Sequence, residues 1–207
     1  MPQADAQRNQ AQQTALTEAE ALARLDARLS ALMRLQEDVQ KKGALEPWLA
    51  KHELTTLGRL WQKLQVEAGW ETAIEAVLNE RMTGLEVRNL DWARAFAADA
   101  PPARLAFYQL PVAAAAAPAP VGLTALTSLL RISDPELRTL LHAWLGHVFI
   151  AKDITEALAL RASLPAGALL VVQGGHLVDA HSVRFYAPDS EQAGLLARQQ
   201  EIENLQR

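Results

Sequence analysis

The sequence contains no cysteine, few aromatic residues and no long apolar run. The absence of cysteine excludes a disulfide framework and a thiolate metal site, and it fits a cytoplasmic protein. The most apolar stretches, residues 112–120 and 166–172, are too short to cross a bilayer. The polar, glutamine-rich residues 1–13 lack the apolar segment of a signal peptide. We therefore expect a soluble protein with no membrane partner.

An excess of positive charge is also absent, because the formal net charge is −4. This balance excludes a protein that coats nucleic acid through bulk charge alone, although it is compatible with a local basic patch. Half of the 207 residues are apolar and 21% are charged, which is typical of a globular protein. The length allows one domain with extensions, or two small subdomains that share a core.

The N-terminal region carries one narrow apolar stripe. Its members, each three or four residues from the next, are Leu22, Leu25, Leu29, Leu32, Leu35 and Val39. This spacing predicts a helix from about Thr17 to Lys42 with a single apolar face. The cations Lys41 and Lys42, followed by Gly43, are typical of a helix end.

The C-terminal region repeats this pattern over a shorter length. A helix start signal at 188–190 precedes Leu195, Ile202 and Leu205, which share one stripe. Because a helix with a narrow stripe needs a partner, we predict that the two ends pair as an antiparallel coiled coil. Two ordinary amphipathic helices packed on the domain are the alternative. The pattern stops at Arg207 without a capping signal, so we interpret the chain as an interior piece of a longer protein.

The middle of the chain alternates between strand and helix patterns. We expect strands at 60–66, 85–88, 105–108, 148–150, 168–173, 177–178 and 182–186. We expect helices at 47–52, 70–82, 135–145 and 153–164, and a further helix that Asp91 caps and that carries Trp92 and Phe96. In the helix at 70–82, Ile74 and Leu78 belong to the apolar face and Glu75 lies largely off it. Gly174 and Gly175 are expected to form a hairpin turn.

This order predicts the fold class α/β (α+β), with two small α/β subdomains flanked by the two coil helices. The alanine- and proline-rich segment breaks the pattern and predicts a linker or a long surface loop. The expected division is a tail and incoming helix at 1–42, subdomains at 43–111 and 123–188, the linker at 112–122, and an outgoing helix at 189–207.

A search for chemistry gives no catalytic, cofactor-binding or metal-binding residues. The sequence has neither a GxxxxGK[ST] nor a GxGxxG motif, and Ser182 has no GxSxG context. The histidine pairs His142/His147 and His176/His181 have a spacing that does not suit two ligands on one helix face. We therefore predict that this fragment is not an enzyme and needs no cofactor.

Two groups of residues are candidates for surfaces. Trp70, Trp92 and Trp144 lie on expected helix faces and are assigned to the core. The alternation instead places Trp61 opposite Leu60, which makes Trp61 a candidate interface residue. Among the dispersed basic residues, Arg59, Lys63 and Arg184 are candidates for contact with DNA phosphates.

Four segments resemble the hinge domain of SMC (structural maintenance of chromosomes) proteins, in the family's order. Residues 57–82 resemble its opening strand and its "aiEavL" helix, and residues 144–164 its "lLgnvlvvddleeAlala" segment. Residues 171–179 (VVQGGHLVD) resemble its "vTldGdlv" hairpin, and 196–205 the start of its returning coil. The resemblance implies a homodimer that joins two arms of a chromosome-condensing ATPase, whose heads and kleisin-type partners lie outside this chain. It also implies a nucleoid-associated location and weak DNA binding.

The sequence departs from this family where many hinges carry paired glycines at the dimer interface. It has Asn79-Glu80-Arg81 and Val183-Arg184-Phe185-Tyr186 at those places, which resembles the proteobacterial branch. The interface residues that the resemblance implies are Asn79, Arg81, Val183, Phe185 and Tyr186, in addition to Trp61. The alternative is a small-molecule-binding or enzymatic α/β domain that dimerises through its coiled-coil arms.

Overall fold

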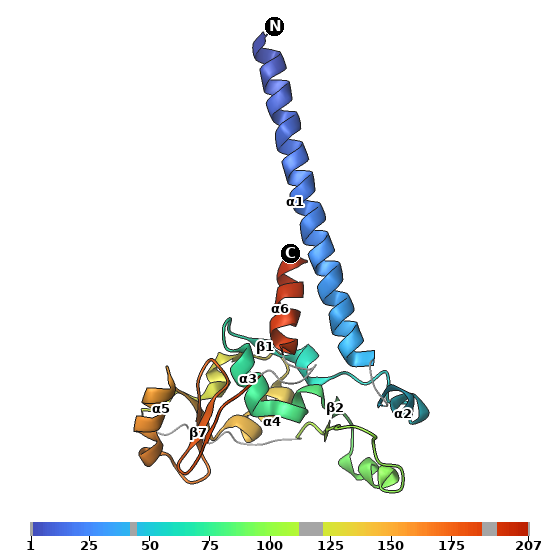
Figure 1. Cartoon of the computed structure of the whole chain (residues 1–207). Helices are drawn as coiled ribbons and strands as arrows, with labels where there is room; N and C mark the ends of the chain where they lie inside the picture. The colour runs from blue at the N-terminus through green and yellow to red at the C-terminus, as the bar shows by residue number, and fades with distance from the viewer. Residues whose placement is uncertain (1, 42–44, 112–121, 188–193, 207) are drawn as a thin grey trace. The chain divides into compact units, whose positions relative to one another are not determined.

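The computed structural model describes residues 2–41, 45–111, 122–187 and 194–206 (Figure 1). The chain divides into two compact units. One consists of Met1–Lys41 with Arg198–Arg207, and the other of Lys42–Ala197. The strands that the structure describes all belong to the second unit.

The first unit contains α1 (Pro2–Lys41) and most of α6 (Leu195–Leu205). The predicted helix start near Thr17 is wrong, because α1 begins at Pro2. Alanine and glutamine, which favour a helix, make up most of residues 2–13, and proline is tolerated in the first turn. Helix α1 ends at Lys41, one residue before the predicted end at Lys42. Lys42, Gly43 and the predicted start of the outgoing helix at 188–190 lie outside the described residues.

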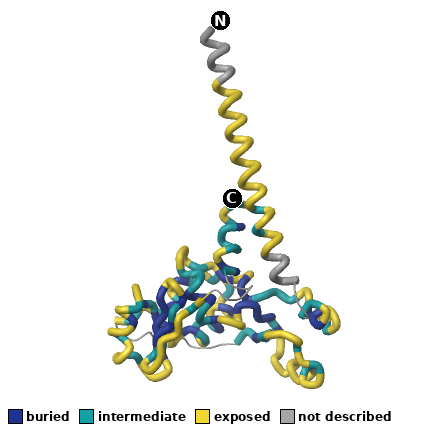
Figure 2. The backbone as a smooth tube through the Cα atoms, viewed as in Figure 1, coloured by how far each residue is buried: buried dark blue, intermediate teal, exposed yellow. Residues whose placement is uncertain are grey.

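Within this unit the two helices run side by side in opposite directions, as predicted (Figure 1). The Arg28 guanidinium forms an ion pair with the Glu201 carboxylate. Among the side chains described on α1, residues 10–35, only Leu29 and Leu32 are partly buried and the rest are exposed (Figure 2). The central part of the predicted stripe is therefore the part that the short α6 covers.

The second unit is built from short elements. Its α-helices are α2 (Leu45–Lys51), α3 (Glu71–Leu78), α4 (Pro135–Leu145) and α5 (Ile154–Leu160). Its 3-10 turns are η1 (Leu60–Lys63), η2 (Asn79–Thr83), η3 (Leu90–Phe96), η4 (Leu126–Leu129) and η5 (Arg161–Ser163). Its strands are β1 (Gln65–Val66), β2 (Leu85–Glu86), β3 (Phe107–Tyr108), β4 (Leu130–Arg131), β5 (Val148–Ile150), β6 (Leu169–Val171), β7 (Leu177–Asp179) and β8 (Val183–Arg184).

The strands form three sheets. The largest has the order β5-β6-β7-β8, with β5 and β6 parallel and the other pairs antiparallel. Strands β2 and β3 pair in parallel, and β1 pairs with β4 in antiparallel fashion. The parallel pairs β2/β3 and β5/β6 are each connected through a helical segment, which confirms the predicted α/β crossovers.

The four-stranded sheet separates two apolar clusters because successive side chains in a strand point to opposite faces. Val148, Val171 and Leu177 belong to the larger cluster, which also contains residues of α3 and α4. Phe149, Leu170 and Val178 belong to a second cluster that Ala157 of α5 completes. The sequence patterns at 135–145 and 148–150 match α4 and β5 at both ends.

The larger cluster draws residues from both predicted subdomains. It includes Ile74 and Leu78 from the first and Leu137 and Leu141 from the second. A third cluster lies under α2 and contains Trp48 and Leu49 together with Leu54 and Leu85. The predicted linker at 112–122 lies outside the described residues except for Gly122, so the division into two subdomains stays a prediction.

Three local predictions are wrong. Residues 60–63 form η1, and a strand is present only at Gln65–Val66. The cap of η3 is Asn89, whose side chain accepts a hydrogen bond from the Asp91 amide at 2.8 Å. Trp92, which was assigned to the core, is 54% exposed.

Among the helices that the structure describes, none has the length and hydropathy needed to cross a membrane.

Candidate functional site

Strand β8 is an edge strand, because it pairs with β7 alone in the sheet order. The Asp179 amide donates to the Ser182 carbonyl at 3.0 Å, and Leu177 lies opposite Arg184 in the same register. In an antiparallel pair, hydrogen-bonded and non-hydrogen-bonded positions alternate. It follows that Arg184 bonds to β7, whereas the N–H and C=O groups of Val183 and Phe185 point away from it.

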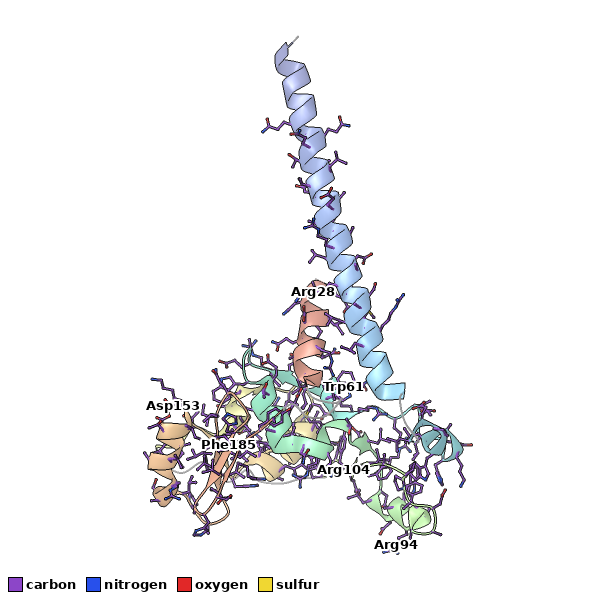
Figure 3. All side chains as sticks on the ribbon, viewed as in Figure 1. Arg28, Trp61, Arg94, Arg104, Asp153 and Phe185 are labelled. Atoms are coloured by element: carbon purple, nitrogen blue, oxygen red, sulfur yellow. The ribbon has the colours of Figure 1, made fainter. Side chains whose placement is uncertain are left out.

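The side chains on this edge are apolar and exposed. Val183 is 36% exposed and Phe185 is 73% exposed (Phe185 is labelled in Figure 3). Val183 lies opposite Val178, so it shares the sheet face of the second cluster. The edge thus combines backbone hydrogen-bonding groups that point outward with an aromatic ring that is exposed to solvent in the single chain.

A histidine side chain extends the hydrogen bonding between β7 and β8 beyond the last backbone pair. Register places His176 opposite Phe185, and their rings meet in a T-shaped contact with centroids 5.1 Å apart. The Tyr186 amide points back towards β7 and donates a hydrogen bond to Nδ1 of His176 at 3.1 Å. His176 therefore supplies the next rung of the ladder and holds Phe185 in the strand.

The predicted Gly174-Gly175 turn lies directly under this segment. Gly175 has a φ of +79°, which favours glycine. A Cβ atom at this position would approach the Tyr186 ring to 3.0 Å and the Thr72 methyl group to 3.1 Å. Glycine is thus required both by the backbone conformation and by the close approach of Tyr186.

The second predicted interface segment begins at the C-terminus of α3. Asn79 has φ 48° and ψ −124°, a conformation that glycine adopts far more easily than other residues. Asn79 stands where many hinges carry glycine according to the resemblance. The backbone here keeps a glycine-like conformation although the residue is not glycine.

Arg81 is fixed over an aromatic ring. Its guanidinium carbon lies 4.8 Å from the centroid of Trp144, which in turn makes an edge contact with Tyr108 at 6.1 Å. Burial, and then the neighbouring Glu86 carboxylate, raise the pKa of Tyr108, so its hydroxyl stays protonated and donates to Glu86 at 3.3 Å. An arginine held in this way presents its charge at a defined place on the surface.

Trp61 differs from the expectation. It is 4% exposed and belongs to the larger cluster with Leu60 and Leu64, so it does not cover a second surface. Its Nε1 atom has no hydrogen-bond partner among the described residues. The reason is that η1 is helical, and Leu60, Trp61 and Leu64 therefore share one side.

The three candidate DNA-binding residues do not form one patch of free charges. Lys63 is paired with the Glu86 carboxylate. Arg59 is half-buried, and its guanidinium donates to the Thr83 carbonyl at 3.5 Å; this burial lowers the pKa of Arg59, while Glu46 opposes the shift. Arg184 is exposed on β8 and belongs to a different sheet from the elements around Arg59.

Sequence reasoning missed the role of Glu75. This residue was expected largely off the apolar face of α3, but it is only 8% exposed. Its carboxylate accepts the Gly194 amide at 2.8 Å and the Leu196 amide at 2.7 Å. It therefore caps the first turn of α6. The signal in the sequence was its position directly after Ile74 and one turn before Leu78, both buried.

In the described part of the chain, no group of three or more histidine and acidic side chains is arranged to hold a metal ion. The geometry of these residues is that of a surface for association, with a β-strand edge and an ordered arginine.

Comparisons with known proteins agree with this description. Residues 54–161 match the family model described as the flexible hinge domain of SMC proteins. The chain is 73% identical to the chromosome partition protein Smc of Bordetella petrii and 56% identical to that of Burkholderia pseudomallei, each over 207 residues. These alignments include the whole of this chain but only 18% of each relative's length.

Solved structures show the same fold. An asymmetric dimer of the Geobacillus stearothermophilus SMC hinge domain superposes with a TM-score of 0.69 at 23% identity, over 91% of this chain and 82% of that one. The Pyrococcus furiosus Smc hinge domain with an extended coiled coil gives a TM-score of 0.54 at 16% identity, over 98% of this chain and 78% of that one. The resemblance noted in the sequence is confirmed, as is the predicted fold class.

Proposed function

This chain belongs to the family of SMC flexible hinge domains, and from that premise we propose that it joins two copies of a longer SMC protein by homodimerisation. A hinge is a domain for association, which agrees with the prediction that this fragment is not an enzyme.

The observation that carries the proposal is the edge of β8. The outward backbone groups of Val183 and Phe185 offer a template for a further strand, and pairing would satisfy them. Phe185 supplies the aromatic anchor typical of interface centres. Asn79 and Arg81 form the second proposed segment, and Tyr186 supports the first. Trp61 contributes through the core, since little of it is exposed.

The wider setting follows from the family and the named relatives. We propose that the whole protein acts in chromosome condensation and segregation, driven by ATP hydrolysis in heads outside this chain. We also propose kleisin-type partners at those heads and a nucleoid-associated location in the cytoplasm. The relatives' shared description as chromosome partition proteins supports this proposal.

DNA binding by this fragment is proposed to be weak. Of the three candidate residues, Lys63 is paired with Glu86 and Arg59 is half-buried. Arg184 is the exposed candidate. Since each neutralised phosphate contributes to affinity, few available cations imply low affinity.

The proposal is tested by light scattering of the whole chain and of variants at the edge. Phe185→Lys places a charge in the proposed interface, and Val183→Pro removes an outward N–H without removing a bond to β7. Both variants should be monomeric at concentrations where the unchanged chain is a dimer. Their circular dichroism should stay that of the folded chain.

The control distinguishes the hinge from the arms as the site of dimerisation. Leu22→Lys changes an exposed position of the α1 stripe, where the side chain is 66% exposed. This variant should remain dimeric. A monomeric Leu22→Lys variant together with a dimeric Phe185→Lys variant would refute the proposal and favour dimerisation through the coiled-coil arms.

A further inference from the structure

His176 holds the exposed edge in place through an atom that can be protonated. Its Nδ1 accepts the Tyr186 amide at 3.1 Å, which requires a lone pair on that nitrogen. The ring is therefore the neutral tautomer with its proton on Nε2. Protonation of Nδ1 would set two N–H groups against each other and remove this rung of the ladder.

The position of this rung links it to the surface used for association. The last ladder pair of β7 and β8 is Leu177 with Arg184, so Phe185 has no backbone bond to β7. The His176–Tyr186 hydrogen bond is the next tie after Phe185 in the chain. The same imidazole also makes the T-shaped contact with the Phe185 ring. One side chain thus orients both the backbone and the ring of the edge residue.

The described contacts of the His176 ring carry no charge. They come from the Phe185 ring and the Tyr186 amide. The charged or titratable side chains on the surrounding elements are Glu71 and Glu75 of α3, Asp179 of β7, Arg184 of β8 and the Tyr186 phenol. Glu71 accepts from Gly69, Glu75 from Gly194 and Leu196, and Asp179 from Ser182, so these carboxylates have other described partners.

We propose that His176 is a positioning residue that makes the hinge interface sensitive to pH, by holding the Phe185–Tyr186 edge only while its Nδ1 is unprotonated. The inference rests on the proposed dimerisation through β8. A proton on Nδ1 occupies the lone pair that the Tyr186 amide needs, so the edge is held in the unprotonated state and released in the protonated one. Association is therefore expected to weaken in mild acid.

The test is the dimer dissociation constant of the whole chain, measured by sedimentation at about pH 8 and about pH 5.5. The unchanged chain should dissociate about five- to tenfold more readily at the lower pH, which is the effect expected for the loss of one hydrogen bond. In His176→Asn, the side-chain oxygen lies near the place of Nδ1 and accepts the amide without titrating. This variant should bind equally well at both pH values.

Two further variants separate the hydrogen bond from packing and from other histidines. His176→Phe keeps an aromatic contact with Phe185 but has no acceptor, so its dimer should be weak at both pH values. His181→Asn changes an exposed histidine of the adjacent turn and should keep the pH dependence of the unchanged chain. Thermal unfolding of each monomer checks that the fold is retained.

The outcomes distinguish the two proposals. An unchanged chain that is monomeric at about pH 8 contradicts the proposed dimerisation, and the inference with it. A dimer whose dissociation constant does not change with pH, or a His176→Asn variant that keeps the full pH dependence, overturns the role of His176 and leaves dimerisation standing. Pulse-labelled hydrogen exchange of the Tyr186 amide gives an independent check. Faster exchange in mild acid in the unchanged chain, but not in the His176→Asn variant, would support the role of His176.

Discussion

At the scale of single residues, Asn79 carries backbone strain at the end of α3. Its φ of 48° with ψ of −124° lies where side chains other than glycine are disfavoured, at a cost of about 1–3 kcal/mol. The strain is located where the family resemblance places glycine. The backbone therefore has a glycine-like conformation at a position where the resemblance places glycine.

Replacing Asn79 by glycine should stabilise the protein. Glycine removes the strain, and its greater freedom in the unfolded chain offsets part of the gain, leaving about 1 kcal/mol in the free energy of unfolding. We expect Asn79→Gly to raise the Tm by about 2–4 °C in a thermal melt. Asn79→Ala is the matched control and should lower it, because alanine tolerates positive φ less well than asparagine.

The residues of the candidate site were predicted unevenly, for physical reasons. Val183 and Phe185 were named from the resemblance, and the structure leaves both exposed. Trp61 was placed on a surface because an alternating pattern was read as a strand, whereas the chain forms a 3-10 turn there. The roles of His176 and Glu75 depend on contacts between distant segments, which one sequence does not display.

At the scale of elements, α2 is joined to the segment after η3 by one carboxylate. Asp99 accepts hydrogen bonds from Lys51 at 2.6 Å and pairs with Nε2 of His52 at 2.8 Å, while its carbonyl accepts Nε1 of Trp48 at 2.9 Å. These bonds, that of Lys51 first and that of His52 next, hold the pKa of Asp99 below its ordinary value of 3.8. The folded state therefore favours the ionised carboxylate.

Asp99 should make the stability of this lobe sensitive to acid. Because its pKa is lower in the folded state, the stabilisation is present above the unfolded pKa and is lost as the pH falls through the folded value. Urea denaturation should find the unchanged chain more stable than Asp99→Asn at neutral pH. The two should converge below about pH 4.

A control on the same lobe separates this effect from surface charge in general. Asp91 pairs with Arg94 at 3.1 Å, and their side chains are 66% and 86% exposed, respectively. Exposed pairs contribute little to stability, so Asp91→Asn should behave like the unchanged chain at neutral pH. A loss equal to that of Asp99→Asn would contradict a specific role for Asp99.

Elements were predicted best where several local signals agree. Helix α4 begins with Asp134 as a cap and Pro135 in the first turn, and both its ends were predicted correctly. The same holds for β5, whose continuous apolar residues are buried on both faces of the sheet. The strand predicted at residues 60–66 was wrong. Leu60, Leu64 and Val66 fit an alternating pattern in the sequence, but the adjacent residues Leu60 and Trp61 are both buried, which requires a turn of helix.

At the scale of the whole molecule, charge limits how tightly the fragment can bind DNA. The net charge is −4, and the pairing of Lys63 leaves few of the three candidate cations free for a phosphate backbone. Counterion release makes DNA affinity depend on salt with a slope of about −0.9 per phosphate contacted. A shallow slope therefore reports few contacts.

Salt titration of duplex DNA binding should give a slope of about −1 to −3, in line with at most three contacting cations. Arg184→Ala should reduce its magnitude by about one. Lys63→Ala is the matched comparison and should leave it nearly unchanged, because Lys63 is already neutralised by Glu86. A slope steeper than about −5 would instead require a larger basic surface than these residues provide.

The Glu75 cap has a consequence for the order in which the molecule is made. Glu75 bonds to amides that follow it by 119 and 121 residues, so α6 receives its cap only when nearly the whole unit has left the ribosome. At about 5–20 residues per second, that separation takes on the order of ten seconds. During that interval α1 has been synthesised but its antiparallel neighbour has not, and its leucines have no partner from their own chain. During synthesis, the leucine stripe of α1 is therefore exposed to the α1 helices of neighbouring nascent chains. This exposure ends when the folded core caps α6 and α6 pairs with α1.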